Sequence, residues 1–170
     1  QSMCSFYGEW KGMMGRCYSP TRLERNPTYM GCAVVPEWHS FMAFKAWMAS
    51  QDWNGKQLDK DLLQHGNKVY GPETCIFISG QLNLFTTDRG VNRGSYPIGV
   101  NWDARAKKFR ARCRNPFTGK HEHLGHYTNQ NDAHEAWRKR KHELACIYAD
   151  QQIDPRIANA LRTRYTETTK

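Results

Sequence analysis

The sequence contains no long apolar run, no paired cysteines and no signal-like start, and each absence excludes a class of protein. No apolar stretch approaches the roughly 18 residues that a membrane span needs. The first residues lack the charged-then-apolar layout of a secretory signal. Hydrophobic residues still make up 39% of the 170 residues, with 6 Trp and 7 Phe, which suffices for one ordinary domain or two small ones. We therefore expect a soluble, cytoplasmic protein with no membrane partner.

Cysteine usage argues against a disulfide scaffold. The six cysteines are scattered with no C-x-x-C pair, and a disulfide framework is not expected in a cytosolic chain of this size. Most of them are expected to be small, buried apolar residues. The alternative is that Cys17, Cys32 and Cys75, together with His65, hold a structural Zn²⁺ ion.

Positive charge is concentrated in one segment. The net charge is +9, yet residues 1–88 carry eight Lys/Arg and eight Asp/Glu, which cancel. Residues 89–149 carry thirteen basic and five acidic residues, and the remaining tail adds only +1. Such a concentration is typical of a nucleic-acid-binding domain, because a uniformly basic surface would not divide so sharply.

The first part of the chain predicts two helices separated by a loop and a short strand. "FYGEWKGMMGRCY" (6–18) places large apolar residues at helical spacing. "SPTRLERNP" (19–27) is predicted to be a loop, and "YMGCAVVPEW" (29–38) a short strand that Pro36 ends. In "HSFMAFKAWMASQ" (39–51) an apolar stripe indicates a helix facing the core, formed by Phe41, Phe44, Trp47 and Met48.

The segment "LDKDLLQHGNKVYGPETCIF" (58–77) has the outline of a hairpin followed by a helix. Acidic residues stand at a strand end, Gly66-Asn67 lies in a polar loop, and a turn at Gly71-Pro72 is expected to start the helix. The next stretch, "SGQLNLFTTDRGVNRGSYP" (79–97), is predicted to be a linker because of its Gly, Asp, Asn and Ser content.

After this linker the apolar period changes from helical to two. Ile98, Val100 and Trp102 alternate with small or polar residues, and "NPFTGK" (115–120) is a turn between the second and third strands. The pattern predicts a three-stranded antiparallel sheet with one apolar and one basic face. A helix capped by Asn129 is expected to pack on the sheet.

A final helix is expected to begin at Asp154 and Pro155. The predicted fold class is therefore α+β, with a helical module and the hairpin-and-helix segment 58–77 linked to the three-stranded sheet and its helix. The predicted domains are residues 1–90, residues 91–150 and a C-terminal helix or tail at 151–170.

The basic face of this sheet is the candidate DNA-binding surface. Residues two apart on a strand point the same way, so arginines of the second strand form one row, and arginine suits guanine edges or phosphates. The predicted contacts are Arg110, Arg112 and Arg114, flanked by Asn101, Arg105, His121 and His123, with Lys107, Lys108 and Lys120 suited to phosphates. The alternative is a merely solvated face, although such faces normally mix charges of both signs. Glu122 falls on the apolar side by alternation, which leaves the register of the third strand open.

Residues 91–150 resemble the APETALA-type, or ethylene-response-factor, DNA-binding domain. The resemblance lies in the Gly-Val opening, the alternating second strand, the Leu-Gly-x-Tyr close and the Ala-x-x-Ala-Trp helix of "YPIGVNWDARAKKFRARCRNPFTGKHEHLGHYTNQNDAHEAW". It implies a three-stranded sheet that packs on one helix and enters the major groove of double-stranded DNA.

The first half is similar to phage HNH, or His-Me-finger, homing endonucleases. The similarity rests on "LDKD", "GNK" and "PETC", and on "GRCYSP", "TYMGCAVVPEW" and "FKAWM" before them. It implies a ββα finger that holds Mg²⁺ or Mn²⁺, in a protein of the infected host's cytoplasm. Asp59 matches the metal-binding acid, Lys60 falls at the position of the catalytic histidine, and Thr74 falls at that of the helix asparagine.

Three alternatives stay open for this finger. In the first, Asp59, Asp61 and Asn67 bind Mg²⁺, Lys60 holds the phosphate, and His65 or the metal activates water. Lys60 is itself a poor base, since a lysine is charged at neutral pH unless strongly desolvated. In the second the finger is inactive and the chain acts by occupying DNA, and in the third it is a structural hairpin. The residues that could fold back into the missing roles are His65, Asn67 and Asn83.

Together these patterns predict a monomer that binds specific sites on double-stranded DNA without a small-molecule cofactor. A single finger favours Mg²⁺-dependent nicking over double-strand cleavage.

Overall fold

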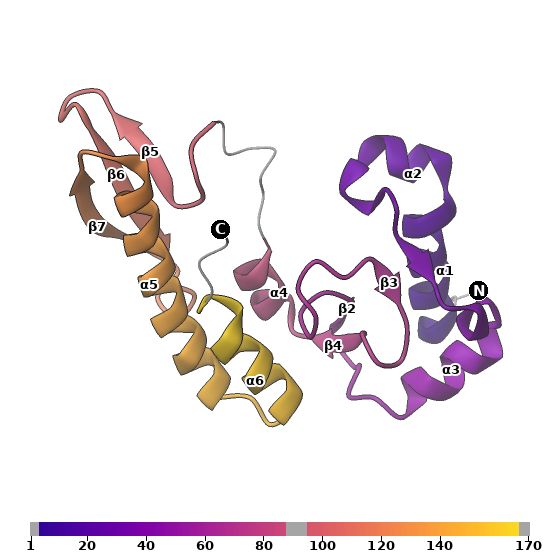
Figure 1. Ribbon diagram of the computed structural model, residues 1–170. Helices are drawn as coiled ribbons and strands as arrows, with labels where there is room; N and C mark the ends of the chain where they lie inside the picture. Colours follow the sequence, from indigo (N-terminus) through magenta and orange to yellow (C-terminus); the bar gives the residue numbers. More distant parts are fainter. Residues whose placement is uncertain (1–3, 88–94, 167–170) are drawn as a thin grey trace. The chain divides into compact units, whose positions relative to one another are not determined.

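The computed structural model describes residues 4–87 and 95–166, which belong to two compact units. The first unit is Gln1–Leu84 and the second is Phe85–Lys170. Figure 1 shows the helices and strands of both. The predicted boundary near residue 90 lies outside the described residues. Along the chain, the division between the two units falls between Leu84 and Phe85.

The first unit combines helices with two small sheets of two strands each. Strand β1 pairs in parallel with β3, and β2 pairs antiparallel with β4. In chain order the elements are α1 (Ser5–Tyr18), α2 (Pro20–Arg25), η1 (Pro27–Tyr29), β1 (Ala33–Val34), η2 (Pro36–His39), α3 (Phe41–Ala49), β2 (Gln57–Asp59), β3 (Val69–Tyr70), β4 (Ile76–Ile78) and, reaching into the second unit, α4 (Gly80–Thr86).

The core of the first unit is aromatic and sulfur-rich. Met13 on α1 and Phe44 and Met48 on α3 are fully buried, which confirms both predicted helices and their inward faces. Trp38 packs edge-on against Phe44, with ring centroids 5.1 Å apart. The short strand before Pro36 is also confirmed, as β1.

Three predictions for the first unit are wrong. The loop at 19–27 is helical because Ser19 stands before Pro20, which is preorganised for the first position of a helix. The turn at Gly71 is a single helical turn that ends before β4, because Ile-Phe-Ile at 76–78 is buried as a strand. The linker prediction fails at α4, where the Ser79 hydroxyl accepts the Leu82 N–H. Residues 88–94 of that predicted linker lie outside the described residues.

The second unit is a three-stranded antiparallel sheet packed on a long helix. The strand order is β5-β6-β7, and α5 contacts all three strands, with α6 packed alongside α5 (Figure 1). The elements are β5 (Val100–Asp103), β6 (Lys108–Arg114), β7 (His121–Tyr127), α5 (Gln130–Asp150) and α6 (Pro155–Arg164). Asn129 and Asp154 cap the two helices, as predicted.

A glycine brings α5 close to the sheet. Gly99 has φ +81°, and a Cβ there would lie 2.1 Å from Cδ1 of Trp137 on α5. The Trp137 ring therefore packs directly on the backbone before β5. Val100, Ala111 and Ala133 form the buried core beside this contact, so the small residues of α5 allow the close approach.

The mixed α+β class is confirmed, with helices in both units and small sheets that are mainly antiparallel. Among the described residues, no helix combines the length and apolar character that a membrane crossing requires.

Candidate nucleic-acid interface and finger loop

The side of the β5–β7 sheet that faces away from α5 carries a basic surface, here called the basic face. Arg112 and Arg114 are exposed and Arg110 is half-buried, whereas the residues between them, Ala111 and Cys113, are buried. Across the sheet, Arg110 stands opposite Asn101 on one side and His126 on the other; Arg112 stands opposite His123 and Arg114 opposite His121.

A β-bulge in β7 adds a histidine to this face. The pairing shifts between Ala111 and Arg112, so Leu124 is an extra residue in β7. His123 and His126 are both exposed and their rings lie 4.9 Å apart. Simple alternation would put them on opposite faces, so sequence reasoning missed His126. The signal is Gly125, whose φ of +127° suits a bulge.

One carboxylate lies on the basic face. Asp103 Oδ2 is 3.1 Å from His126 Nε2 and 4.0 Å from an Arg110 guanidinium nitrogen. The Ala106 N–H and the His126 side chain lower the pKa of the Asp103 carboxyl. Asp103 thus partly neutralises the Arg110 end of the row and leaves Arg112 and Arg114 as its uncompensated charges among the described residues.

The remaining predicted contacts lie at both ends of the sheet. Arg105 and Lys107 are in the β5–β6 turn, which the Asp103 side chain holds by accepting the N–H groups of residues 105 and 106. Lys108 opens β6, and Lys120 precedes β7. All four are exposed, a position that suits phosphate contacts on either side of a groove.

Glu122 lies on the apolar side, as its alternation predicted, and has partners there. It pairs with Cys113 across the strands, and its carboxylate accepts hydrogen bonds from Arg140 of α5 at 2.6 Å and from Asn115 at 2.8 Å. The Arg140 and Asn115 hydrogen bonds lower the pKa of Glu122 to about 2. This ion pair joins β7 to α5 and stabilises the β6–β7 register, which places the histidines of β7 opposite the arginines of the basic face.

In the first unit, the predicted catalytic lysine, Lys60, is buried and hydrogen-bonded. Lys60 is only 8% exposed. Its ammonium donates to the Asn67 carbonyl at 2.8 Å and to Asp61 Oδ2 at 3.2 Å. A buried, hydrogen-bonded ammonium of this kind closes the loop between β2 and β3 (residues 60–68), here called the finger loop.

The predicted metal ligands have hydrogen-bond partners within the same loop. Asp59 Oδ1 accepts the N–H groups of Asp61 and Leu62. The Asn67 amide donates to the carbonyls of residues 60 and 69, each at 2.7 Å. Thr74 donates to the residue 69 carbonyl at 2.8 Å and lies in the single turn that precedes β4. Asn67 and Thr74 thus donate to the same carbonyl, and Asp61 contacts the Lys60 ammonium.

The other two groups considered for the finger are His65, within the same loop, and Asn83, outside it. His65 is exposed at the loop tip. Asn83 on α4 donates to the Gln57 side chain at 2.6 Å. Within residues 4–87 and 95–166, no group of three or more His, Cys, Asp or Glu side chains is placed to hold a metal ion.

The cysteines proposed for zinc are buried in the core. Cys17, Cys32 and Cys75 are 6%, 6% and 0% exposed, as expected for small apolar residues. Burial raises the pKa of the Cys17 thiol to about 11 and that of Cys75 to about 12. The zinc site stays a prediction.

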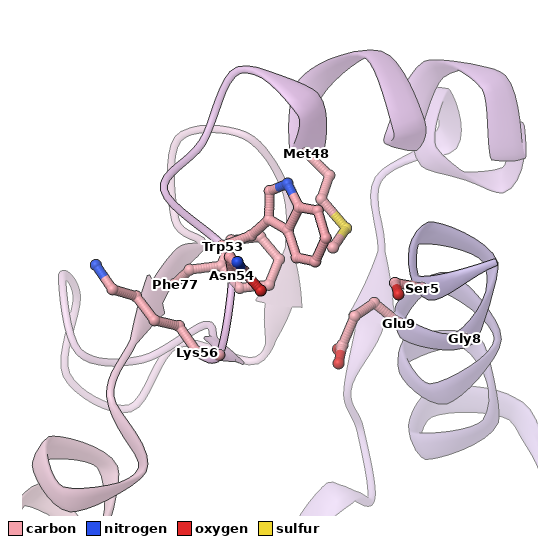
Figure 2. Close-up of a pocket in the computed structure, with 9 residues that line it drawn as sticks. Ser5, Gly8, Glu9, Met48, Trp53, Asn54, Lys56 and Phe77 are labelled. Carbon is pink, nitrogen blue, oxygen red and sulfur yellow. The ribbon is translucent and has the colours of Figure 1, made fainter.

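A separate pocket of about 370 Å³ lies between α1 and the turn before β2 (Figure 2). Figure 2 shows Glu9 of α1 facing Trp53 across it. None of the predicted site residues lines this pocket; its lining is Ser5, Gly8, Glu9, Met48, Trp53, Asn54, Gly55, Lys56 and Phe77.

Comparison with protein-family models, with curated proteins and with solved structures finds no match to this chain. The two resemblances therefore stay predictions, and function is inferred from the geometry of each unit.

Proposed function

We propose that the chain binds double-stranded DNA through the basic face of the β5–β7 sheet. The observation that carries the proposal is the row of Arg110, Arg112 and Arg114, with exposed histidines opposite each of them. A two- or three-stranded ribbon fits the major groove, and arginine forks match guanine edges and phosphate oxygens. The concentration of charge in residues 89–149 supports the same partner.

Sequence specificity is assigned to Arg112 first. It is exposed at the centre of the row. Its backbone N–H donates to the Gly99 carbonyl at 2.8 Å, so its strand is held to the segment on which Trp137 of α5 packs. A side chain on a rigid strand positions its donors better than one on a turn. The turn residues Arg105, Lys107 and Lys120 are assigned to the phosphates.

The experiment is site selection from a random duplex pool, followed by titration of the selected site. Arg112→Ala is expected to weaken specific binding by roughly 1–3 kcal/mol and to relax one base position. Lys139→Ala is the matched control, because Lys139 is an exposed cation of the same unit on α5. An Arg112→Ala variant that selects the same site with parental affinity would contradict the proposal.

Metal-dependent nicking by the first unit is a second candidate function. The observation that favours it is the order of β2, β4 and α4, a strand pair followed by a helix, with Asp59 at the end of the first strand. The hydrogen bonds of Lys60 and Asn67 favour the alternative, a non-cutting DNA-binding protein. Conversion of supercoiled DNA to open circle with Mg²⁺ or Mn²⁺, but not with EDTA, distinguishes the two.

A further inference from the structure

An arginine in the first unit, Arg16, has two guanidinium nitrogens without a hydrogen-bond partner among the described residues. Arg16 lies in the last turn of α1, half-buried. Its Nε and one Nη atom are buried and make no hydrogen bond within the described part of the chain. No carboxylate among the described residues pairs with it. Removing a charged donor from water without a partner is costly, so a buried guanidinium normally has an anionic or carbonyl acceptor.

A second cation lies against the same aromatic ring. The Arg16 guanidinium carbon is 5.6 Å from the centre of the Tyr70 ring, and the Lys60 ammonium is 5.9 Å from it. Asp61 is the carboxylate that Lys60 contacts. Burial raises the pKa of the nearby Cys17 thiol, and the positive charges of Arg16 and Lys60 act to lower it. The surroundings of Tyr70 therefore hold more positive than negative charge, in a unit whose charges otherwise cancel.

We propose that Arg16 forms an oxyanion-binding site beside the finger loop, and that its ligand is a backbone phosphate of DNA. A guanidinium presents two parallel N–H groups that match two oxygens of a phosphate. Lys60 adds positive potential from the loop side of the ring but keeps its own hydrogen bonds. The identity of the ligand rests on the proposed DNA-binding function, whereas the anion site itself does not.

The site gives the first unit a role in binding that its overall charge does not suggest. The basic face contacts DNA from the second unit, and Arg16 contacts a phosphate from the first. Both contacts release counterions, so each phosphate that Arg16 neutralises steepens the salt dependence of DNA binding by about 0.9.

The test uses the full chain and two probes. In the first arm, inorganic phosphate is titrated at constant ionic strength while the Arg16 Nε–H resonance and the thermal midpoint are followed. The parent is expected to show a saturable shift and a raised midpoint, and Arg16→Gln to show neither. Arg22→Gln is the matched control, since Arg22 is an exposed arginine on α2 whose guanidinium donates to the Gly12 carbonyl.

In the second arm, DNA affinity is measured against salt concentration. Arg16→Gln is expected to reduce the slope of log K against log[salt] by about 0.9, and Arg16→Lys to retain most of it. Absence of a phosphate-dependent shift in the parent overturns the anion site, whether or not the Gln variant folds. A phosphate shift with an unchanged DNA slope overturns DNA as the ligand. Failure of the parent to bind any DNA overturns the proposed function, while the first arm still decides the anion site.

Discussion

Replacing Gly99 with alanine tests the docking of the sheet on α5. The added Cβ would lie 2.1 Å from Cδ1 and 2.2 Å from Cγ of Trp137, and Gly99 has φ +81°. The left-handed conformation costs an L-residue about 1–2 kcal/mol. Overpacking adds about 1–3 kcal/mol, because the tryptophan must leave its position. Gly99→Ala is therefore expected to lower the free energy of unfolding of the second unit by about 3 kcal/mol.

The assay is urea unfolding of the full chain, followed at the amide signals of β6. Gly119→Ala is the control, because Gly119 has φ +70° but an added Cβ there meets nothing within 4 Å. Gly119→Ala is expected to lower the free energy of unfolding only by the cost of the left-handed conformation, about 1–2 kcal/mol. Equal losses in the two variants would refute the close packing of Trp137 on Gly99. DNA affinity should fall with Gly99→Ala as well, since Arg112 is hydrogen-bonded to the Gly99 carbonyl.

Three further predictions concern pH and cleavage. The pKa of Glu122 is lowered to about 2 from an ordinary 4.5, so the stability it contributes is present above pH 4.5 and lost as the pH falls toward 2. Glu122→Gln is expected to lower the free energy of unfolding by about 1–2 kcal/mol at neutral pH, a figure discounted for the partial exposure of Glu122. Unfolding experiments at acid pH should show this difference from the parent disappear. Burial lowers the pKa of Lys141 to about 8 from 10.5, so the unfolded chain binds more protons between these values and stability rises with pH there. Urea unfolding of Lys141→Met should lack that rise. If the finger cuts DNA, Asp59→Ala should abolish metal-dependent nicking in a plasmid assay with DNA affinity within a few-fold; equal loss of both would make Asp59 structural.

Much of the second unit could be predicted from local patterns. Alternation over β6 correctly separates the buried Ala111 and Cys113 from the exposed arginines. Asn129 and Asp154 are recognisable caps because their side chains need only the next few backbone N–H groups. The register of β7 could not be predicted, because it depends on a one-residue bulge and on the pairing of Glu122 with Arg140, eighteen residues away.

The finger loop was harder to predict because backbone groups decide its structure. The sequence places Lys60 at the position of a catalytic residue, yet its main acceptor is the carbonyl of Asn67, which any residue could supply. The composition of residues 79–87 indicated a linker, whereas Ser79 as a cap and the buried Leu82 and Phe85 produce α4. The two Arg16 nitrogens that lack a hydrogen bond among the described residues could not be predicted from the sequence, since the neighbouring ring, Tyr70, lies far along the chain.

The most direct test of DNA binding by the basic face is the salt dependence of affinity for one duplex, measured for the parent and for Arg112→Ala/Arg114→Ala. If the basic face binds DNA, log K falls steeply with log[salt] in the parent, by roughly 0.9 per phosphate neutralised. The double variant is then expected to bind more weakly than the parent at every salt concentration. A flat response in the parent, or equal affinities for the two proteins, would contradict the assignment of the basic face as the DNA-binding surface.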